Sequence, residues 1–224
     1  MREKVLFGGL VLTSLFRELI ISGSSTIIEH IDSMRKSRQA SLAFFYCDFR
    51  DEKKKDLRGL LSSLLIQLCD QSDPYCDILS DFYSEHRRGS QYPGNDALLQ
   101  CLIRMLKISG NAPVFIIVDA LDECPNTTDA PSPRDKVLSL VEELVNSQIP
   151  NLHICVTSRP EADIQLVLDG LAFRSVSLHG ESGQIDDIVE YVKSFVNTDS
   201  KMRRWKVVDK ELVIEVLIQN ADGM

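Results

Sequence analysis

Hydrophobic residues gather into three short, uninterrupted runs that have the pattern of strands buried on both faces of a sheet. The runs are rich in β-branched and aromatic residues and cover residues 41–45, 114–118 and 152–156. A further run at 173–178 predicts a fourth strand. Helical patterns fill the intervals between the runs, and this alternation predicts a mainly parallel sheet with right-handed crossover connections.

The interval between the first two strands predicts three helices. Residues 57–68 carry a leucine stripe on one face, with Asp56 as the expected N-cap. A coiled-coil seam is the alternative, but a stripe of about three turns favours a helix that faces the core. Less regular helical spacing at 75–86, and a helix that opens at Asn95 or Asp96, complete the interval.

Capping residues predict where two other helices begin. Thr26 and Glu29 have the spacing of a capping box, which predicts a helix start at Thr26. Ser132 is the expected N-cap of a later helix, with Pro133 at its first position. After Gly183 the apolar spacing is helical only, which indicates the beginning of a second, helical subdomain.

The composition is that of a soluble globular chain, and it narrows the classes of partner. Of 224 residues, 44% are hydrophobic, and the net charge of −8 argues against a general nucleic-acid binder, which needs basic residues to neutralise phosphates. The six cysteines show no CxxC pair and no zinc-ligand spacing, so we expect free thiols in a reducing, intracellular setting. Residues 5–16 are uncharged but too short to span a bilayer, and a secretory signal peptide is the less favoured interpretation.

The clearest candidate for chemistry is the stretch 114–123, where a buried strand runs into carboxylates. Asp119 ends the apolar run, and Asp122 and Glu123 follow it. Ligands of open α/β sheets bind beyond the carboxyl ends of the strands. A hydrophobic strand that ends in an acid is the Walker B pattern, whose carboxylate helps to hold Mg²⁺ near nucleotide phosphates. An acidic turn after an ordinary strand is the alternative, and the second acidic pair makes the Walker B interpretation more specific.

Arg159 lies just past the next predicted strand, 152–156. A guanidinium at the carboxyl end of a strand can bind a phosphate through two parallel hydrogen bonds. Taken alone, such an arginine is more often a surface ion-pair partner. Its position one crossover helix after the Walker B strand favours a phosphate-binding role.

Four segments together resemble a NACHT domain, and more narrowly the NACHT modules of fungal NLR-like STAND proteins. They are residues 44–51, 114–123, 157–160 and 187–192. The resemblance covers residues 24–224. It implies a three-layer α/β P-loop NTPase fold with a mainly parallel sheet, followed by part of a helical subdomain. It also implies an ATP- or GTP-switched oligomerisation module of innate-immunity or programmed-cell-death-like signalling.

The same resemblance implies roles for individual residues. Asp119 would hold Mg²⁺, and Asp122 and Glu123 would polarise or position the attacking water. Arg159 would read the terminal phosphate of ATP or GTP. The resemblance further implies a cytoplasmic location with protein partners or a homo-oligomer, and no contact with a membrane or a nucleic acid.

One part of the family pattern is missing. A P-loop has the sequence Gly-x-x-x-x-Gly-Lys-Ser/Thr, whose backbone N–H groups and lysine bind phosphates. The chain has no Gly-Lys-Ser/Thr, and alignment on residues 25–31 puts Ile20 at about the lysine position. We therefore expect an atypical segment at 1–23, hypothetically a foreign or mis-joined piece. A nucleotide-binding core at 24–180 and a truncated helical subdomain at 181–224 would follow.

Two functions stay open on the sequence alone. The first is an NTP-hydrolysing signalling switch, impaired in nucleotide binding, with Mg²⁺ and ATP or GTP as its cofactors. The second is a nucleotide-free pseudo-NTPase that has no cofactor and acts through protein contacts. A P-loop kinase or an AAA+ module is a third interpretation, which the segments at 157–160 and 187–192 disfavour.

Overall fold

A computed structural model describes most of the chain. The described residues are 4–8, 24–51, 56–86, 90–108, 112–128, 131–171, 174–177, 182–199, 201–202 and 205–221. Contacts divide the chain into two compact units, one formed by Lys4–Val176 and the other mainly by Ser177–Met224. Each unit is a structural body of its own, and the larger one contains the sheet.

The sheet of the larger unit confirms the predicted strands. Strands β2 (Ser41–Tyr46), β3 (Val114–Asp119) and β4 (Leu152–Ser158) lie side by side and run parallel. The fourth predicted strand is β5 (Arg174–Ser177), and the order across the sheet is β2-β3-β4-β1-β5. The fold is therefore mixed α/β, built around a parallel sheet of three strands.

Strand β1 (Lys4–Gly8) is an antiparallel member of the sheet, which the sequence predicts to be mainly parallel. It pairs with β4 in the antiparallel direction, with Lys4 opposite Ser158 and Gly8 opposite Ile154. The five pairs of this register run from Lys4–Ser158 to Gly8–Ile154, so the two strands point in opposite directions. Its C-terminal end consequently lies at the edge of the sheet opposite to the C-terminal end of β4.

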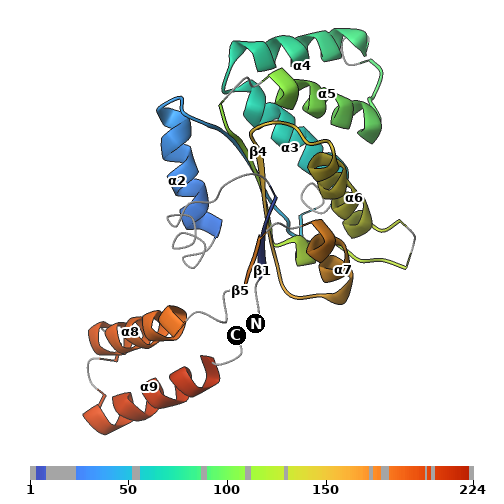
Figure 1. Cartoon of the computed structure of the whole chain (residues 1–224). Coiled ribbons are helices and arrows are strands. Elements are labelled where there is room, and N and C mark those ends of the chain that lie inside the picture. The colour runs from blue at the N-terminus through green and yellow to red at the C-terminus, as the bar shows by residue number, and fades with distance from the viewer. Residues whose placement is uncertain are drawn as a thin grey trace. The chain divides into compact units, whose positions relative to one another are not determined.

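Helices cover both faces of the sheet (Figure 1). Helix α2 (Ser24–Lys36) lies on one face, and α3 (Leu57–Cys69), α6 (Pro133–Asn146) and α7 (Ala162–Leu171) lie on the other. Helices α4 (Asp73–Glu85) and α5 (Asn95–Ile108) pack against α3 on its far side from the sheet.

The core follows the alternation of side chains along the strands. On β3, the alternate residues Val114, Ile116 and Val118 join the large apolar cluster that contains the leucine stripe of α3. The intervening Phe115 and Ile117 are also buried, outside that cluster. A strand with both faces covered needs an uninterrupted apolar run, which is why the sequence predicts these strands well.

Three helix starts test the capping predictions. The Asp56 carboxylate accepts a hydrogen bond from the Gly59 N–H at 2.8 Å, which confirms the cap of α3. Ser132 caps α6, which confirms the second prediction. The prediction at Thr26 is wrong, because α2 begins at Ser24 and Thr26 lies inside its first turn. Residue types place a helix start only to within one or two residues, which is the difference found here.

The smaller unit contains a pair of helices. These are α8 (Ser182–Thr198) and α9 (Val207–Ala221), as the helical spacing predicts. The rings of Tyr191 and Phe195 stack on α8 with centroids 6.1 Å apart. Several apolar side chains of α9 are exposed, among them Val208 and Leu212.

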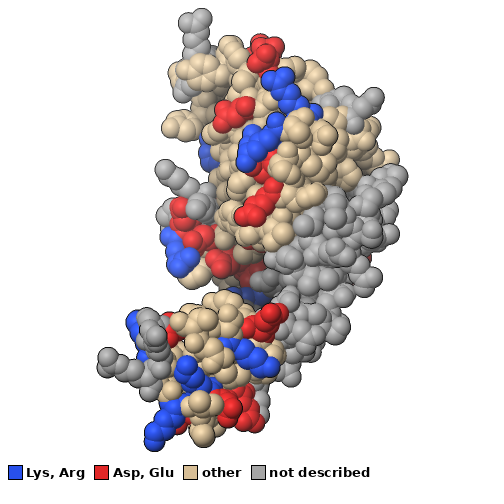
Figure 2. All heavy atoms as spheres, turned by 90° about the vertical axis from the view of Figure 1, so that its left-hand side faces the viewer, with Lys and Arg blue, Asp and Glu red and all other residues tan. Residues whose placement is uncertain are grey.

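Charges are mixed on the face shown in Figure 2, where acidic and basic side chains are interspersed among uncharged ones. Within this view, the coloured residues form no continuous basic stripe. Across the part of the chain that the structure describes, none of the helices combines the length and hydropathy that a membrane span requires.

Candidate functional site

The C-terminal ends of β2, β3 and β4, at Tyr46, Asp119 and Ser158, form one edge of the sheet, called here the carboxyl edge. Asp119 closes β3, and the hydroxyl of Thr157 on β4 donates a hydrogen bond to its Oδ1. The same hydroxyl accepts a hydrogen bond from the Ala120 N–H at 3.0 Å. The buried Thr157 side chain therefore orients the Asp119 carboxylate and the first peptide of the loop after β3.

A tight turn leads from β3 into the acidic loop. Ala120 has a φ of 53°, a left-handed conformation that a residue other than glycine adopts at a cost of roughly 1–2 kcal/mol. The short 3₁₀ helix Leu121–Glu123 follows, with the Leu121 side chain fully buried. Ala120 thus bends the chain after β3, Leu121 packs in the core, and Asp122 contacts Arg159, which follows β4.

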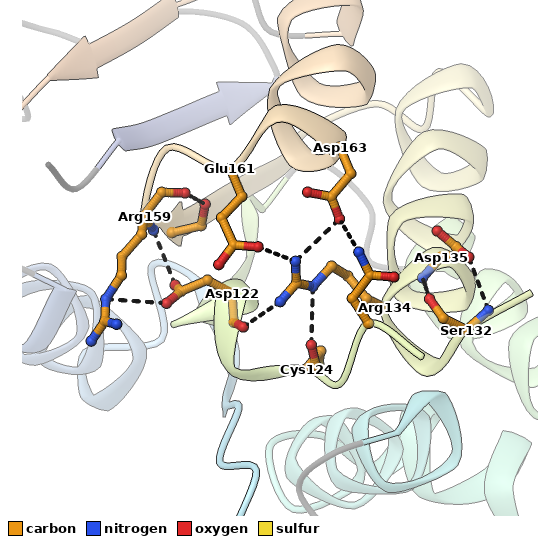
Figure 3. Close-up of polar contacts among 10 residues, drawn as sticks. Asp122, Cys124, Ser132, Arg134, Asp135, Arg159, Glu161 and Asp163 are labelled. Carbon is orange, nitrogen blue, oxygen red and sulfur yellow. Dashed lines mark hydrogen bonds and ion pairs between the residues drawn. The ribbon is translucent and has the colours of Figure 1, made fainter. Parts of the chain in front are cut away.

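Asp122 and Arg159 form an ion pair across the carboxyl edge (Figure 3). The Arg159 N–H donates to Asp122 Oδ1 at 3.0 Å, and Arg159 Nε lies 3.3 Å from Asp122 Oδ2. The Asp122 side chain is 7% exposed, whereas that of Arg159 is 46% exposed. The buried carboxylate thus has its charge partner within the chain, and the guanidinium also reaches solvent.

The Arg134 side chain, 6% exposed, ties the acidic loop to the loop after β4. Its Nε donates to the Cys124 carbonyl at 3.0 Å, and Nη2 donates to the Asp122 carbonyl. Nη1 forms ion pairs with Glu161 and Asp163, the latter at 3.1 Å (Figure 3). One buried guanidinium therefore holds both loops that carry the predicted site residues.

A capping box places Arg134 in the first turn of α6. The Ser132 N–H donates to the Asp135 carboxylate at 2.9 Å, and the Asp135 N–H donates to the Ser132 hydroxyl at 3.1 Å. The backbone and side-chain hydrogen bonds of Ser132 hold the pKa of Asp135 below its ordinary value. These reciprocal bonds fix the start of α6 and so the direction in which Arg134 leaves it.

Two cysteines pack beneath the carboxyl edge. The Sγ atoms of Cys47 and Cys124 are 3.4 Å apart, and both side chains are buried. The hydrogen bond with Cys124, together with burial, raises the pKa of the Cys47 thiol. The same hydrogen bond lowers the pKa of Cys124. The buried pair joins the residue after β2 to the acidic loop.

The end of β2 and the start of α2 reach the same edge. Tyr46 pairs in register with Asp119, and burial and the Asp119 charge raise the pKa of Tyr46 despite a hydrogen bond with Ser25 of α2. The pKa of Arg50, in the loop after β2, is raised mainly by its hydrogen-bonded partner Asp48. The N-terminal turn of α2 thus lies close to the carboxylates.

The structure brings together three of the four predicted site residues. Asp119, Asp122 and Arg159 share the carboxyl edge through the contacts above. Glu123 lies on the 3₁₀ helix, and its charge acts on Arg50 in the loop after β2.

Sequence reasoning missed the part that Arg134, Glu161 and Asp163 play around these residues. The sequence pattern does not indicate that Arg134 is buried, because an arginine in the first turn of a helix is ordinarily exposed. Thr157 was within reach of prediction, since it opens the segment 157–160 that ends in Arg159 and proline.

Among the described residues, the carboxyl edge supplies part of what a site for Mg²⁺ and a nucleotide would need. Among the described residues, none of the groups of His, Cys, Asp and Glu brings three side chains together around a metal position. The P-loop sequence is missing from the chain. In addition, β1 runs antiparallel, so its C-terminal residue Gly8 lies opposite Ile154 and away from the carboxyl edge. The described part of the edge thus offers carboxylates and an arginine, and the sequence lacks the loop motif that cradles phosphates.

Comparison with known proteins gives one family. The model of the family described as Nephrocystin 3, N-terminal, matches residues 22–159, more than half of the chain. The matched part runs from just before α2 to Arg159 and includes all four predicted site residues. No curated protein matches the chain.

Proposed function

This chain belongs to the nephrocystin 3 N-terminal family, and on that premise we propose that it is a NACHT-type signalling module with a P-loop NTPase fold whose binding of ATP or GTP is impaired. In this proposal the module works in the cytoplasm through homo-oligomers or other protein partners. The cofactors in this proposal are Mg²⁺ and ATP or GTP, and the carboxyl edge is where they would bind.

The observation that carries the proposal is the shared edge of β3 and β4. Two adjacent parallel strands end there: Asp119 closes β3, and Arg159, which follows β4, is paired with Asp122. This is the edge of an open α/β sheet where ligands bind. The nearby N-terminal turn of α2 adds the positive end of a helix dipole, which favours phosphate.

Two features of the chain should weaken the binding of ATP or GTP. Loop amides and a lysine normally supply much of the binding to the β- and γ-phosphates, and the chain lacks that sequence. Arg159 is already paired with the buried Asp122, so a phosphate would compete with an internal carboxylate for it. Both effects weaken binding of the terminal phosphate.

A specific observation favours the alternative, a nucleotide-free module that acts through protein contacts. The polar groups of the carboxyl edge are satisfied within the chain by Thr157, Arg159 and Arg134. An edge with internally paired charges is stable without a ligand. The two functions therefore differ in whether the edge can still bind a nucleotide when the missing loop is supplied.

Supplying the loop is the experiment that separates them. A P-loop runs directly into the N-terminus of a helix, and α2 begins at Ser24. The lysine position is then Gly23 rather than Ile20, and R17G, S22G and G23K together convert residues 17–24 to Gly-x-x-x-x-Gly-Lys-Ser. We expect this triple variant to gain saturable, Mg²⁺-dependent binding of fluorescent ATP or GTP, measured by anisotropy.

Two further substitutions in the triple variant make the result specific. Asp119→Ala should abolish the gained binding, whereas Glu142→Ala, which removes an exposed carboxylate of α6, should leave it intact. A triple variant that folds, by circular dichroism, but binds neither nucleotide would overturn the proposal in favour of the nucleotide-free module.

A further inference from the structure

A pair of cysteines lies at the turn between α3 and α4. Cys69 is the last residue of α3, and Cys76 lies near the start of α4. Their Sγ atoms are 2.9 Å apart, and the Cys76 thiol also lies 3.0 Å from the Cys69 carbonyl, to which it donates. Cys76 is exposed and Cys69 is partly exposed. Both sulfur atoms are therefore within reach of a reagent in solution, unlike the buried pair of Cys47 and Cys124.

The helix end that carries Cys69 covers the free edge of the sheet. Gln67 Nε2 donates to the Phe44 carbonyl at 2.7 Å, and the Phe44 N–H donates to Gln67 Oε1 at 3.0 Å. Gln71 makes the same two contacts with the N–H and carbonyl of Leu42. The two glutamines replace a neighbouring strand for β2, and Cys69 lies between them in the sequence.

We propose that Cys69 and Cys76 form a reversible redox pair that closes to an intramolecular disulfide in the presence of a low-molecular-weight disulfide such as oxidised glutathione. The bond would fasten the C-terminal end of α3 to α4. It would thereby hold Gln67 and Gln71 against β2. The inference concerns a surface away from the carboxyl edge, so it does not depend on nucleotide binding.

The geometry needs only a small adjustment. A disulfide has an S–S length of about 2.05 Å, so the two sulfur atoms would have to approach by about 0.9 Å. Rotation of the two side chains can supply such a movement. The residues lie seven positions apart across a helix–helix turn, so the bond would close a short loop.

The different exposure of Cys69 and Cys76 determines which thiol reacts first in the thiol–disulfide exchange. Burial, followed by the hydrogen bond with Cys76, raises the pKa of Cys69 to about 11, so the exposed Cys76 is the first nucleophile. Its thiolate attacks one sulfur of glutathione disulfide, forms a mixed disulfide and releases one glutathione thiolate. Cys69 then attacks Cys76 Sγ and displaces the second glutathione. Two protein thiols are oxidised, one glutathione disulfide is reduced to two glutathiones, and the two thiol protons pass to the leaving thiolates.

Thiol mapping of the native full chain tests the proposal. The chain is equilibrated in glutathione buffers of increasing oxidised fraction, alkylated, digested and analysed by mass spectrometry. We expect peptides linked through Cys69 and Cys76, with a loss of two hydrogen atoms and no retained glutathione. Reduction should reverse the linkage. The melting temperature of the oxidised chain should rise by about 5 °C, because the cross-link restricts the unfolded chain.

Single substitutions distinguish closure from simple modification. Cys69→Ser should stop at a stable mixed disulfide on Cys76, and Cys76→Ser should react more slowly because the remaining thiol is partly buried. The wild-type mapping needs no variant, so a variant that fails to fold leaves the test intact. A wild-type chain that keeps glutathione on Cys76, or whose Cys69 pairs with another cysteine, would overturn the proposal.

Discussion

At the scale of single residues, Arg134 shows how one buried charge can organise a surface site. Its guanidinium donates to the carbonyls of Asp122 and Cys124 while pairing with Glu161 and Asp163. Removal of the donor leaves carbonyl groups unpaired and two carboxylates without their cation. The carboxylates are partly exposed, so water can take up some of that loss.

We predict that Arg134→Met lowers the free energy of unfolding by about 2–4 kcal/mol, measured by urea denaturation. The control is Arg104→Met, because Arg104 forms an exposed ion pair with Glu85 at 3.6 Å, and its removal should cost less than about 1 kcal/mol. Equal losses in the two variants would show that the Arg134 contacts do not hold the loops together.

His153 gives a prediction for the dependence of stability on pH. Burial lowers its pKa below the ordinary value of 6.5, and its ring stacks on Phe115 with centroids 4.8 Å apart. As the pH falls below 6.5, the unfolded chain binds the proton first, so stability declines until the folded pKa is reached.

His153→Phe keeps an aromatic ring on Phe115 but cannot titrate. The variant should therefore lose less stability than the wild type when the melting temperature is compared at pH 7 and in the acidic range below 6.5. Parallel curves for the two proteins would mean that His153 is charged to the same extent in the folded and unfolded states.

At the scale of elements, Gln67 of α3 and Gln71, which follows α3, cover backbone groups at the edge of β2. The double substitution Gln67→Ala and Gln71→Ala removes both donors and both acceptors from the β2 edge. We expect it to lower the free energy of unfolding by about 2–3 kcal/mol and to promote self-association, measured by denaturation and light scattering. Gln100→Ala, on an exposed position of α5, is the control and should change neither. A monomeric double variant of unchanged stability would refute this role.

The elements also show which patterns a sequence makes visible. The strands β2, β3 and β4 could be predicted because both of their faces are buried, which demands an apolar run. The caps at Asp56 and Ser132 could be predicted because a cap requires particular residue types. The hydrogen bonds of Gln67 and Gln71 to β2 could not be predicted. Their partners are backbone groups distant in the sequence, and every strand presents the same groups.

The candidate site, like the fold, could be predicted only in part. Asp119 and Arg159 follow apolar strands, and parallel strands bring their C-terminal ends to one edge. The sequence did not predict that Asp122 pairs with Arg159, which would otherwise be free to bind a ligand. This ion pair depends on the left-handed turn at Ala120. Alanine is an unusual residue in that conformation, so the turn has no recognisable sequence pattern.

At the scale of the whole molecule, the family match covers only part of the chain that forms the sheet. The match covers residues 22–159, whereas β1 lies before it and enters the sheet between β4 and β5. The direction of β1 could not be predicted, because a run of five residues is compatible with either pairing. The matched part thus carries the carboxylates and Arg159, and the preceding strand brings no phosphate-binding sequence to them.

The central claim is that nucleotide binding at the carboxyl edge, as it stands, is impaired. Equilibrium titration of the folded native chain with fluorescent ATP and GTP in the presence of Mg²⁺ tests it most directly. We predict no saturable binding in the micromolar range for the wild type, for Asp119→Ala or for the control Glu142→Ala. Saturable micromolar binding by the wild type and Glu142→Ala, abolished in Asp119→Ala, would contradict the account and establish a working nucleotide site without a P-loop.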